Sequence, residues 1–189
     1  MIPEPAPVKP LRVEITNYWI VELEEKATWA STLPQSEWGG DDTIPVKVGT
    51  ETQQRRYPHA FIHAVMMQGC AKVPDGVLTY DGHEFALLDR GKFPWGQAAT
   101  GEALTPLVSI AVDPHFIPLR TWCMMPALKG FYLPDNTRHD GRVYACDTGG
   151  RIRGAHVDLF VGKAANKVDG AVGEWDPKTR KAYVDLTIV

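Results

Sequence analysis

The sequence predicts a mainly β protein with one inserted helix. Hydrophobic residues make up 44% and charged residues 23% of the 189-residue chain, which is enough for a sizeable core. From residue 83 onward, short apolar runs recur between turns rich in Gly and Pro, and only one earlier segment has helical features. Many short strands with frequent turns are typical of a closed barrel or a sandwich.

The N-terminal quarter is predicted to hold an extended segment, a strand and a loop. Residues 1–10 are rich in Pro, which removes backbone donors, so we expect an extended lead-in. Residues 11–24 alternate apolar and polar side chains with β-branched and aromatic content, which indicates a strand. Residues 34–50 contain Gly39, Gly40 and Pro45, which favour a loop.

One helix is expected at about residues 57–70, where Pro58 suits the first turn and Gly69 a stop. Later strands are expected at 106–112, 120–125, 142–147, 155–161 and 182–189. No linker separates these strands from the earlier segments. We therefore expect a single domain over residues 11–189, with the helix in an insertion.

Charge and hydropathy exclude some classes of function. The formal net charge of −3 argues against a nucleic-acid partner. No apolar run approaches the roughly 20 residues that span a bilayer. The N-terminus has no apolar core of a secretory signal, so we expect delivery by another route or a signal already removed.

The cysteines Cys70, Cys123 and Cys146 are an odd set for a disulfide framework. Buried free thiols are one interpretation, and a Cys123–Cys146 bridge is the other. No Cys/His spacing matches a zinc site and no HExxH motif occurs, so no metal or cofactor is expected.

Three aspartates follow or interrupt apolar, strand-like runs: Asp113 in SIAVDP, Asp147 in ACDTGG and Asp158 in HVDLF. A carboxyl among apolar residues is costly to ionise unless it is paired or hydrogen-bonded. If the three meet, repulsion and desolvation keep one of them protonated near neutral pH, as a general acid requires. The plainer interpretation is that Asp113 and Asp147 only form turns.

The order of these segments resembles the three-aspartate (3D) domain of the membrane-bound lytic transglycosylase A family. The matching residues are Leu104-Thr105-Pro106, Ile110-Ala111-Val112-Asp113-Pro114, Phe116-Ile117-Pro118-Leu119, Asp147-Thr148-Gly149-Gly150, Ile152, Gly154, Val157-Asp158, Phe160 and Gly162. Residues 67–76 are also similar to a family segment, with Cys70 and Ala71 in place of Ser-Gly.

The resemblance implies a double-psi β-barrel of about six strands and a peptidoglycan lytic transglycosylase. Asp158 would be the acid/base, supported by Asp147 and Asp113, in cleavage of the MurNAc-β-1,4-GlcNAc bond to a 1,6-anhydro-MurNAc product. A single carboxyl suffices if the sugar's own 6-hydroxyl attacks, and no cofactor is needed. The partner would be peptidoglycan glycan strands, met in the periplasm or cell wall.

Other residues are candidates for binding the glycan. Trp95 and Tyr18 are aromatic, and aromatic side chains are suited to contact with a sugar face. Thr148, Gly149 and Gly150 follow Asp147, where glycines permit close approach of a ligand. The histidines His115 and His156 flank the aspartate motifs, either as solvated bystanders or as groups that tune the site.

The chain also departs from the family. Arg120 stands where Gly is common, and Arg151 and Arg153 flank Ile152. The full-size family members carry a second domain that grips the substrate, and residues 25–90 would supply only part of one. The alternative function is a non-catalytic, expansin-like glycan-binding module, or a wall-docking part of a phage or secretion apparatus. Three acids in one site favour catalysis over binding alone.

Overall fold

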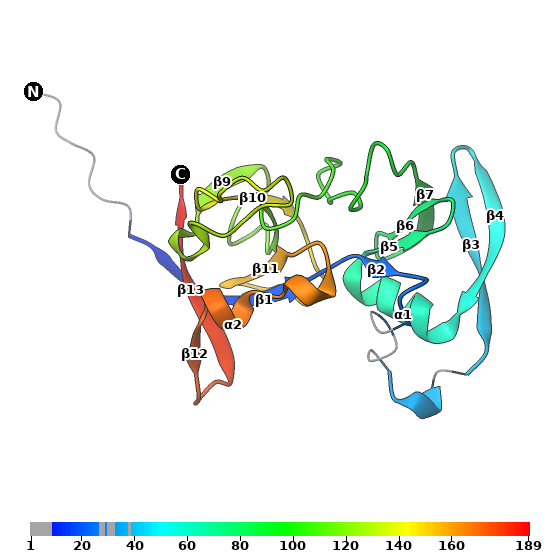
Figure 1. Cartoon of the computed structure of the whole chain (residues 1–189), viewed down its shortest axis with the longest axis horizontal. Coiled ribbons are helices and arrows are strands. Elements are labelled where there is room, and N and C mark those ends of the chain that lie inside the picture. Colours follow the sequence, from blue (N-terminus) through cyan, green and yellow to red (C-terminus); the bar gives the residue numbers. More distant parts are fainter. Residues whose placement is uncertain (1–8, 27–28, 30–32, 38) are drawn as a thin grey trace, which may run out of the picture. The chain divides into compact units, whose positions relative to one another are not determined.

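A computed structural model describes residues 9–26, 29, 33–37 and 39–189 (Figure 1). The chain folds into two compact units. The first comprises Met1–Asn17, Leu107–Leu159 and Val168–Val189, and the second Tyr18–Pro106 and Phe160–Lys167. The expected barrel domain over 11–189 is thus broader than the first unit. Most of the expected lead-in, residues 1–8, lies outside the described residues.

The first unit is built on a seven-stranded sheet in the order β1-β11-β8-β10-β9-β13-β12. β1 also pairs with β13, which closes six of the strands into a ring and leaves β12 on its outside. The fold class expected from the sequence, a mainly β barrel of about six strands, is confirmed. Its strands are β1 (Leu11–Tyr18), β8 (Ser109–Val112), β9 (Thr121–Met124), β10 (Arg142–Asp147), β11 (His156–Phe160), β12 (Glu174–Asp176) and β13 (Lys181–Ile188).

Buried apolar and less buried polar side chains alternate along these strands. The apolar side chains form the barrel core, and the polar ones lie on the opposite face. One face of each strand is fully or almost fully buried and apolar, as in Val13, Ile15, Ile110, Val112, Val143, Ala145, Val157, Leu159 and Leu186. The intervening residues are more polar and include Asp158. Because side chains alternate between faces, the buried set determines which way the polar set points.

The second unit has its own six-stranded sheet, in the order β2-β5-β6-β7-β3-β4. Its elements are β2 (Val21–Glu22), β3 (Asp41–Val48), β4 (Glu51–Pro58), α1 (His59–Gln68), β5 (Cys70–Val73), β6 (Gly76–Tyr80) and β7 (Phe85–Leu88). Short helices complete the described chain: η3 (Gln35–Glu37), η4 (Pro126–Leu128), η5 (Ala164–Asn166) and α2 (Asp169–Val172).

The loop expected over residues 34–50 is wrong for its second half. Residues Asp41–Val48 form β3, which pairs with β4 from Asp41↔Pro58 to Val48↔Glu51. The turn between the two strands contains Gly49, whose φ is 61°. Pairing with β4 on one side and with β7 on the other outweighs the turn-favouring residues at the start of the segment.

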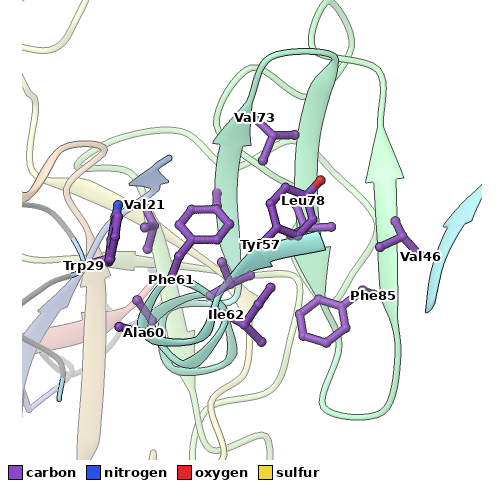
Figure 2. Close-up of a cluster of buried hydrophobic side chains, with 13 residues drawn as sticks. Val21, Trp29, Val46, Tyr57, Ala60, Phe61, Ile62, Val73, Leu78 and Phe85 are labelled. Atoms are coloured by element: carbon purple, nitrogen blue, oxygen red, sulfur yellow. The ribbon is translucent and has the colours of Figure 1, made fainter. Parts of the chain in front are cut away.

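The expected helix is confirmed at His59–Gln68. Pro58 precedes the first turn, and Gly69 ends the helix with a φ of 83° and a 2.7 Å hydrogen bond from its N–H to the carbonyl of Val65. Phe61 on this helix lies among the buried residues of the second unit, near Tyr57 and Trp29 (Figure 2). No helix in the described part of the chain is long and apolar enough to cross a membrane.

Candidate functional site

Strand register places Asp147 and Asp158 on one face of the barrel wall. β8 lies between β11 and β10. In the antiparallel pairing Asp158 is opposite Ala111, and in the parallel pairing Asp147 is opposite the same Ala111. Laterally paired residues point to the same side of a sheet. The two aspartates therefore flank one small side chain on the face away from the apolar interior.

A register shift in β10 decides where Asp147 points. Ala145 pairs with Ile110, but the next pair joins Asp147 to Ala111, so Cys146 is an extra residue. Without this shift, Cys146 would lie opposite Ala111 and Asp147 would point to the other face, because a slip of one residue reverses the side chains. Bulges of this kind re-aim side chains next to active sites.

Asp158 has a side-chain partner from β1. The hydroxyl of Thr16 donates a hydrogen bond to Asp158 Oδ1 at 2.8 Å. The same Thr16 Oγ1 lies 2.8 Å from His156 Nε2. Burial is the first cause that lowers the pKa of His156, ahead of the opposing effect of Glu14. Thr16, His156 and Asp158 thus form a continuous hydrogen-bonded group.

Thr16 is a candidate site residue that the sequence alone did not indicate. It lies in the alternating segment LRVEITNY, where Val13 and Ile15 are buried and Thr16 points to the opposite face. That alternation signals which face the hydroxyl takes. It contains no signal that β11, about 140 residues away, supplies the carboxyl.

Asp113 is anchored by backbone donors. Its Oδ2 accepts a 2.8 Å hydrogen bond from the N–H of Gly154, and its Oδ1 accepts one of 3.0 Å from the N–H of His115. These bonds, the one from Gly154 first, lower the pKa of Asp113. Asp113 therefore stays ionised and ties the end of β8 to the loop that leads into β11. The imidazole of His115 lies 3.3 Å from Asp113, but its side chain is 97% exposed.

The loop after Asp147 is tightly packed at one glycine and open at the next. The N–H of Thr148 donates to Asp147 Oδ1 at 2.9 Å. A Cβ on Gly149 would lie 2.7 Å from Cγ1 of Ile152, whereas one on Gly150 would have no atom within 4 Å. The carbonyl of Gly149 also accepts a 3.1 Å hydrogen bond from the guanidinium of Arg153. Arg153, one of the departures from the family, thus stabilises this loop through a hydrogen bond to its backbone.

The aromatic candidates belong to the second unit. Tyr18 is 7% exposed, and its ring packs against Phe160 with centroids 5.0 Å apart. Trp95 is half-buried and lies edge-on to Phe160 at 6.5 Å. The Nζ atom of Lys72 lies 4.3 Å from the centre of the Trp95 ring. Tyr18 thus contributes to the packing behind Trp95, and of the two, Trp95 offers more surface to a ligand.

All three cysteines are buried free thiols. Cys123 lies opposite Val143 in the β9–β10 pairing. Val143 in turn is three residues before Cys146 along β10. Three residues of strand span about 10 Å, which exceeds the roughly 7 Å that a disulfide tolerates between Cα atoms. The bridge alternative is therefore wrong. Within the described ranges, no group of three or more His, Cys, Asp or Glu residues is placed to hold a metal ion.

The barrel strands, the paired aspartates and the DTGG loop all lie within one continuous stretch of the chain. Residues 108–175 match the 3D domain. The matched segment includes Asp113, Asp147 and Asp158, and runs from β8 to β12. The first part of the barrel, β1 with Thr16, lies outside the matched segment and joins it through strand pairing and through the hydrogen bonds of Thr16.

Two solved structures share the fold of this chain. The crystal structure of E. coli MltA with bound chitohexaose matches with a TM-score of 0.55 and 13% identity, covering 94% of this chain and 71% of that one. A membrane-bound lytic murein transglycosylase from Agrobacterium tumefaciens matches with a TM-score of 0.51 and 16% identity, covering 95% and 76%. A search of curated proteins found no match. At these identities the likeness establishes the fold.

Proposed function

We propose that this chain is a peptidoglycan lytic transglycosylase in which Asp158 is the acid/base. The observation that carries the proposal is the placement of Asp158 beside Ala111, with Asp147 on the other side and the hydroxyl of Thr16 on its carboxyl. The 3D domain match and the fold shared with two lytic transglycosylases support the same reaction. MltA binds a glycan, chitohexaose, in its crystal structure.

The proposed reaction needs one proton that leaves and returns. Asp158 protonates the oxygen of the MurNAc-β-1,4-GlcNAc bond as that bond breaks, and becomes a carboxylate. The 6-hydroxyl of the same muramic acid then attacks the anomeric carbon, and Asp158 accepts the hydroxyl proton. The product is a 1,6-anhydro sugar, and Asp158 is protonated again. The attack is intramolecular, so it benefits from a high effective concentration.

The neighbouring residues suit roles around this acid. Asp113 and Asp147 each accept backbone hydrogen bonds, which favour the ionised carboxyl. A negative charge near the anomeric carbon stabilises the positive charge that develops there as the glycosidic bond breaks. Thr148, Gly149 and Gly150 would let a glycan approach the backbone beside Asp147, and Gly150 has open space around it.

The ring of Trp95 is proposed to contact a sugar face, with Tyr18 and Phe160 supporting its position. Aromatic side chains combine large apolar area with few rotatable bonds. Peptidoglycan strands would be the partner, and the place of action would be the periplasm or the cell wall.

Digestion of purified sacculi in heavy-oxygen water tests the proposal directly. We expect soluble muropeptides ending in 1,6-anhydro-MurNAc, without label, by mass spectrometry. Labelled reducing-end MurNAc would instead indicate a hydrolase, in which a second carboxylate such as Asp147 activates water. Cosedimentation with sacculi without any soluble product would overturn the enzyme and favour the glycan-binding module.

A further inference from the structure

One hydroxyl joins two titratable side chains beside the proposed acid. Thr16 Oγ1 lies 2.8 Å from Asp158 Oδ1 and 2.8 Å from His156 Nε2. A hydroxyl carries a single proton, so Thr16 donates to one neighbour and accepts from the other. The direction of the whole hydrogen-bonded chain therefore depends on which nitrogen of His156 carries the proton.

We propose that His156 and Thr16 are positioning residues, which hold Asp158 Oδ1 as a hydrogen-bond acceptor and so place the transferable proton of Asp158 on Oδ2. In this arrangement His156 Nε2–H donates to Thr16 Oγ1, and the Thr16 hydroxyl donates to Asp158 Oδ1. An oxygen that accepts this bond does not carry the acid proton. The inference rests on the proposed function and names two residues that assist it.

The surroundings of the His156 imidazole favour its neutral form, so its tautomer determines which nitrogen can donate a hydrogen bond. Burial lowers the pKa of His156 and Lys181 acts in the same direction, whereas Glu14 opposes them. Glu14 and Lys181 also bind each other, with Nζ and Oε2 2.6 Å apart. Asp158 lies at the far end of the hydrogen-bonded chain, and the carboxyl of Asp113 accepts a hydrogen bond from the N–H of Gly154, two residues before His156. The ring is thus neutral at neutral pH and carries one proton, on either Nδ1 or Nε2.

Loss of the hydrogen bond from Thr16 to Asp158 has two effects that differ from simple unfolding. The Thr16 bond favours the ionised carboxyl, so its removal raises the pKa of Asp158. The alkaline limb of the activity profile then moves to higher pH. At the same time kcat falls, because the carboxyl is no longer held in one orientation. Residues that orient a metal ligand through a hydrogen bond contribute roughly 10- to 100-fold, and we expect a factor of the same size for a hydrogen bond that orients an acid.

The activity test uses matched substitutions in the full chain. We expect Thr16→Val to lower kcat roughly 10- to 100-fold at an unchanged KM and to shift the alkaline limb upward. Thr16→Ser keeps the hydroxyl and restores both. His156→Gln keeps an amide N–H near the position of Nε2 and retains activity, whereas His156→Asn places its amide near Nδ1 and does not. His83→Gln, at an exposed loop position of the second unit, leaves activity unchanged.

A titration by nitrogen NMR separates this inference from the proposed function, because it needs no substrate. Above its pKa, His156 should be the Nε2–H tautomer, and Thr16→Val should weaken this preference because it removes the oxygen that accepts the bond from Nε2. Asp140→Asn, at an exposed position of the same unit, should leave the tautomer unchanged. A dominant Nδ1–H tautomer, or a tautomer that is the same in Thr16→Val, would overturn the roles of Thr16 and His156 whatever the sacculus assay shows.

Discussion

Asp147 and Asp158 lie opposite the same residue, Ala111, one on each side of β8. Two strand spacings separate their Cα atoms by about 10 Å. Between them, on β8, lies only the small methyl side chain of Ala111. The two aspartates thus lie on the strands on either side of one small side chain.

Replacing the proposed acid should abolish turnover without unfolding the barrel. Asp158→Asn is nearly isosteric but cannot give up a proton, and general acid catalysis contributes roughly 10²- to 10⁴-fold. Sacculus digestion should fall by at least that factor, with a nearly unchanged thermal midpoint. Asp140→Asn, at an exposed position, is the control. If only Asp147→Asn loses activity, the acid role belongs to Asp147.

The two glycines after Asp147 should respond differently to a single methyl group. Gly149→Ala puts a Cβ 2.7 Å from Ile152 Cγ1, and such overpacking typically costs about 1–3 kcal/mol. We expect a lower free energy of unfolding and reduced digestion, because the loop that follows Asp147 shifts. Gly150→Ala meets open space in the protein and should leave the free energy of unfolding unchanged. Equal effects of the two substitutions in urea unfolding would contradict the packing argument.

Asp113 should stabilise the fold in a pH-dependent way. Hydrogen bonds from Gly154 and His115 lower its pKa in the folded state, so its contribution is present above the unfolded value of about 4 and is lost as pH falls. Asp113→Asn should therefore lower the free energy of unfolding at pH 7. The deficit should shrink by pH 3. A deficit in urea unfolding that is the same at both pH values would show that the charge is irrelevant.

The thiols should be unreactive in the folded protein and all free in the unfolded one. Cys70, Cys123 and Cys146 are buried, and burial raises the pKa of Cys123 to about 11, so little of its reactive thiolate form exists at neutral pH. Alkylation of native protein should be slow. In unreduced, denatured protein three labels should appear by mass spectrometry, and a mass with only one label would restore the bridge.

Arg120 occupies a left-handed backbone conformation, with φ of 64°, at the position where the resembling family commonly has Gly. A Cβ in this conformation costs roughly 1–2 kcal/mol. Arg120→Gly should be more stable than Arg120→Ala by about 1 kcal/mol. Both variants lose the same guanidinium, so comparing them isolates the backbone. Equal midpoints in thermal unfolding would mean that the backbone adjusts without cost.

Local patterns were sufficient for the barrel strands and for the helix. The alternation in residues 11–24 and the apolar run at 142–147 correspond to β1 and β10, because side chains alternate between a buried and an open face. Pro58 and Gly69 bound α1 as expected. The hairpin of β3 and β4 was missed, since Gly39, Gly40 and Pro45 favour turns and no local signal reports the pairing with β7.

The sequence by itself determined that three aspartates follow or interrupt barrel strands in a 3D-like order. The tertiary structure alone decided how those aspartates are used. An extra residue at Cys146 turns Asp147 to the face of Asp158, and the closing of the sheet brings Thr16 against Asp158. Register and strand order depend on pairing between segments far apart in the chain, and the free energy of that pairing is distributed over the whole barrel rather than encoded in any one segment.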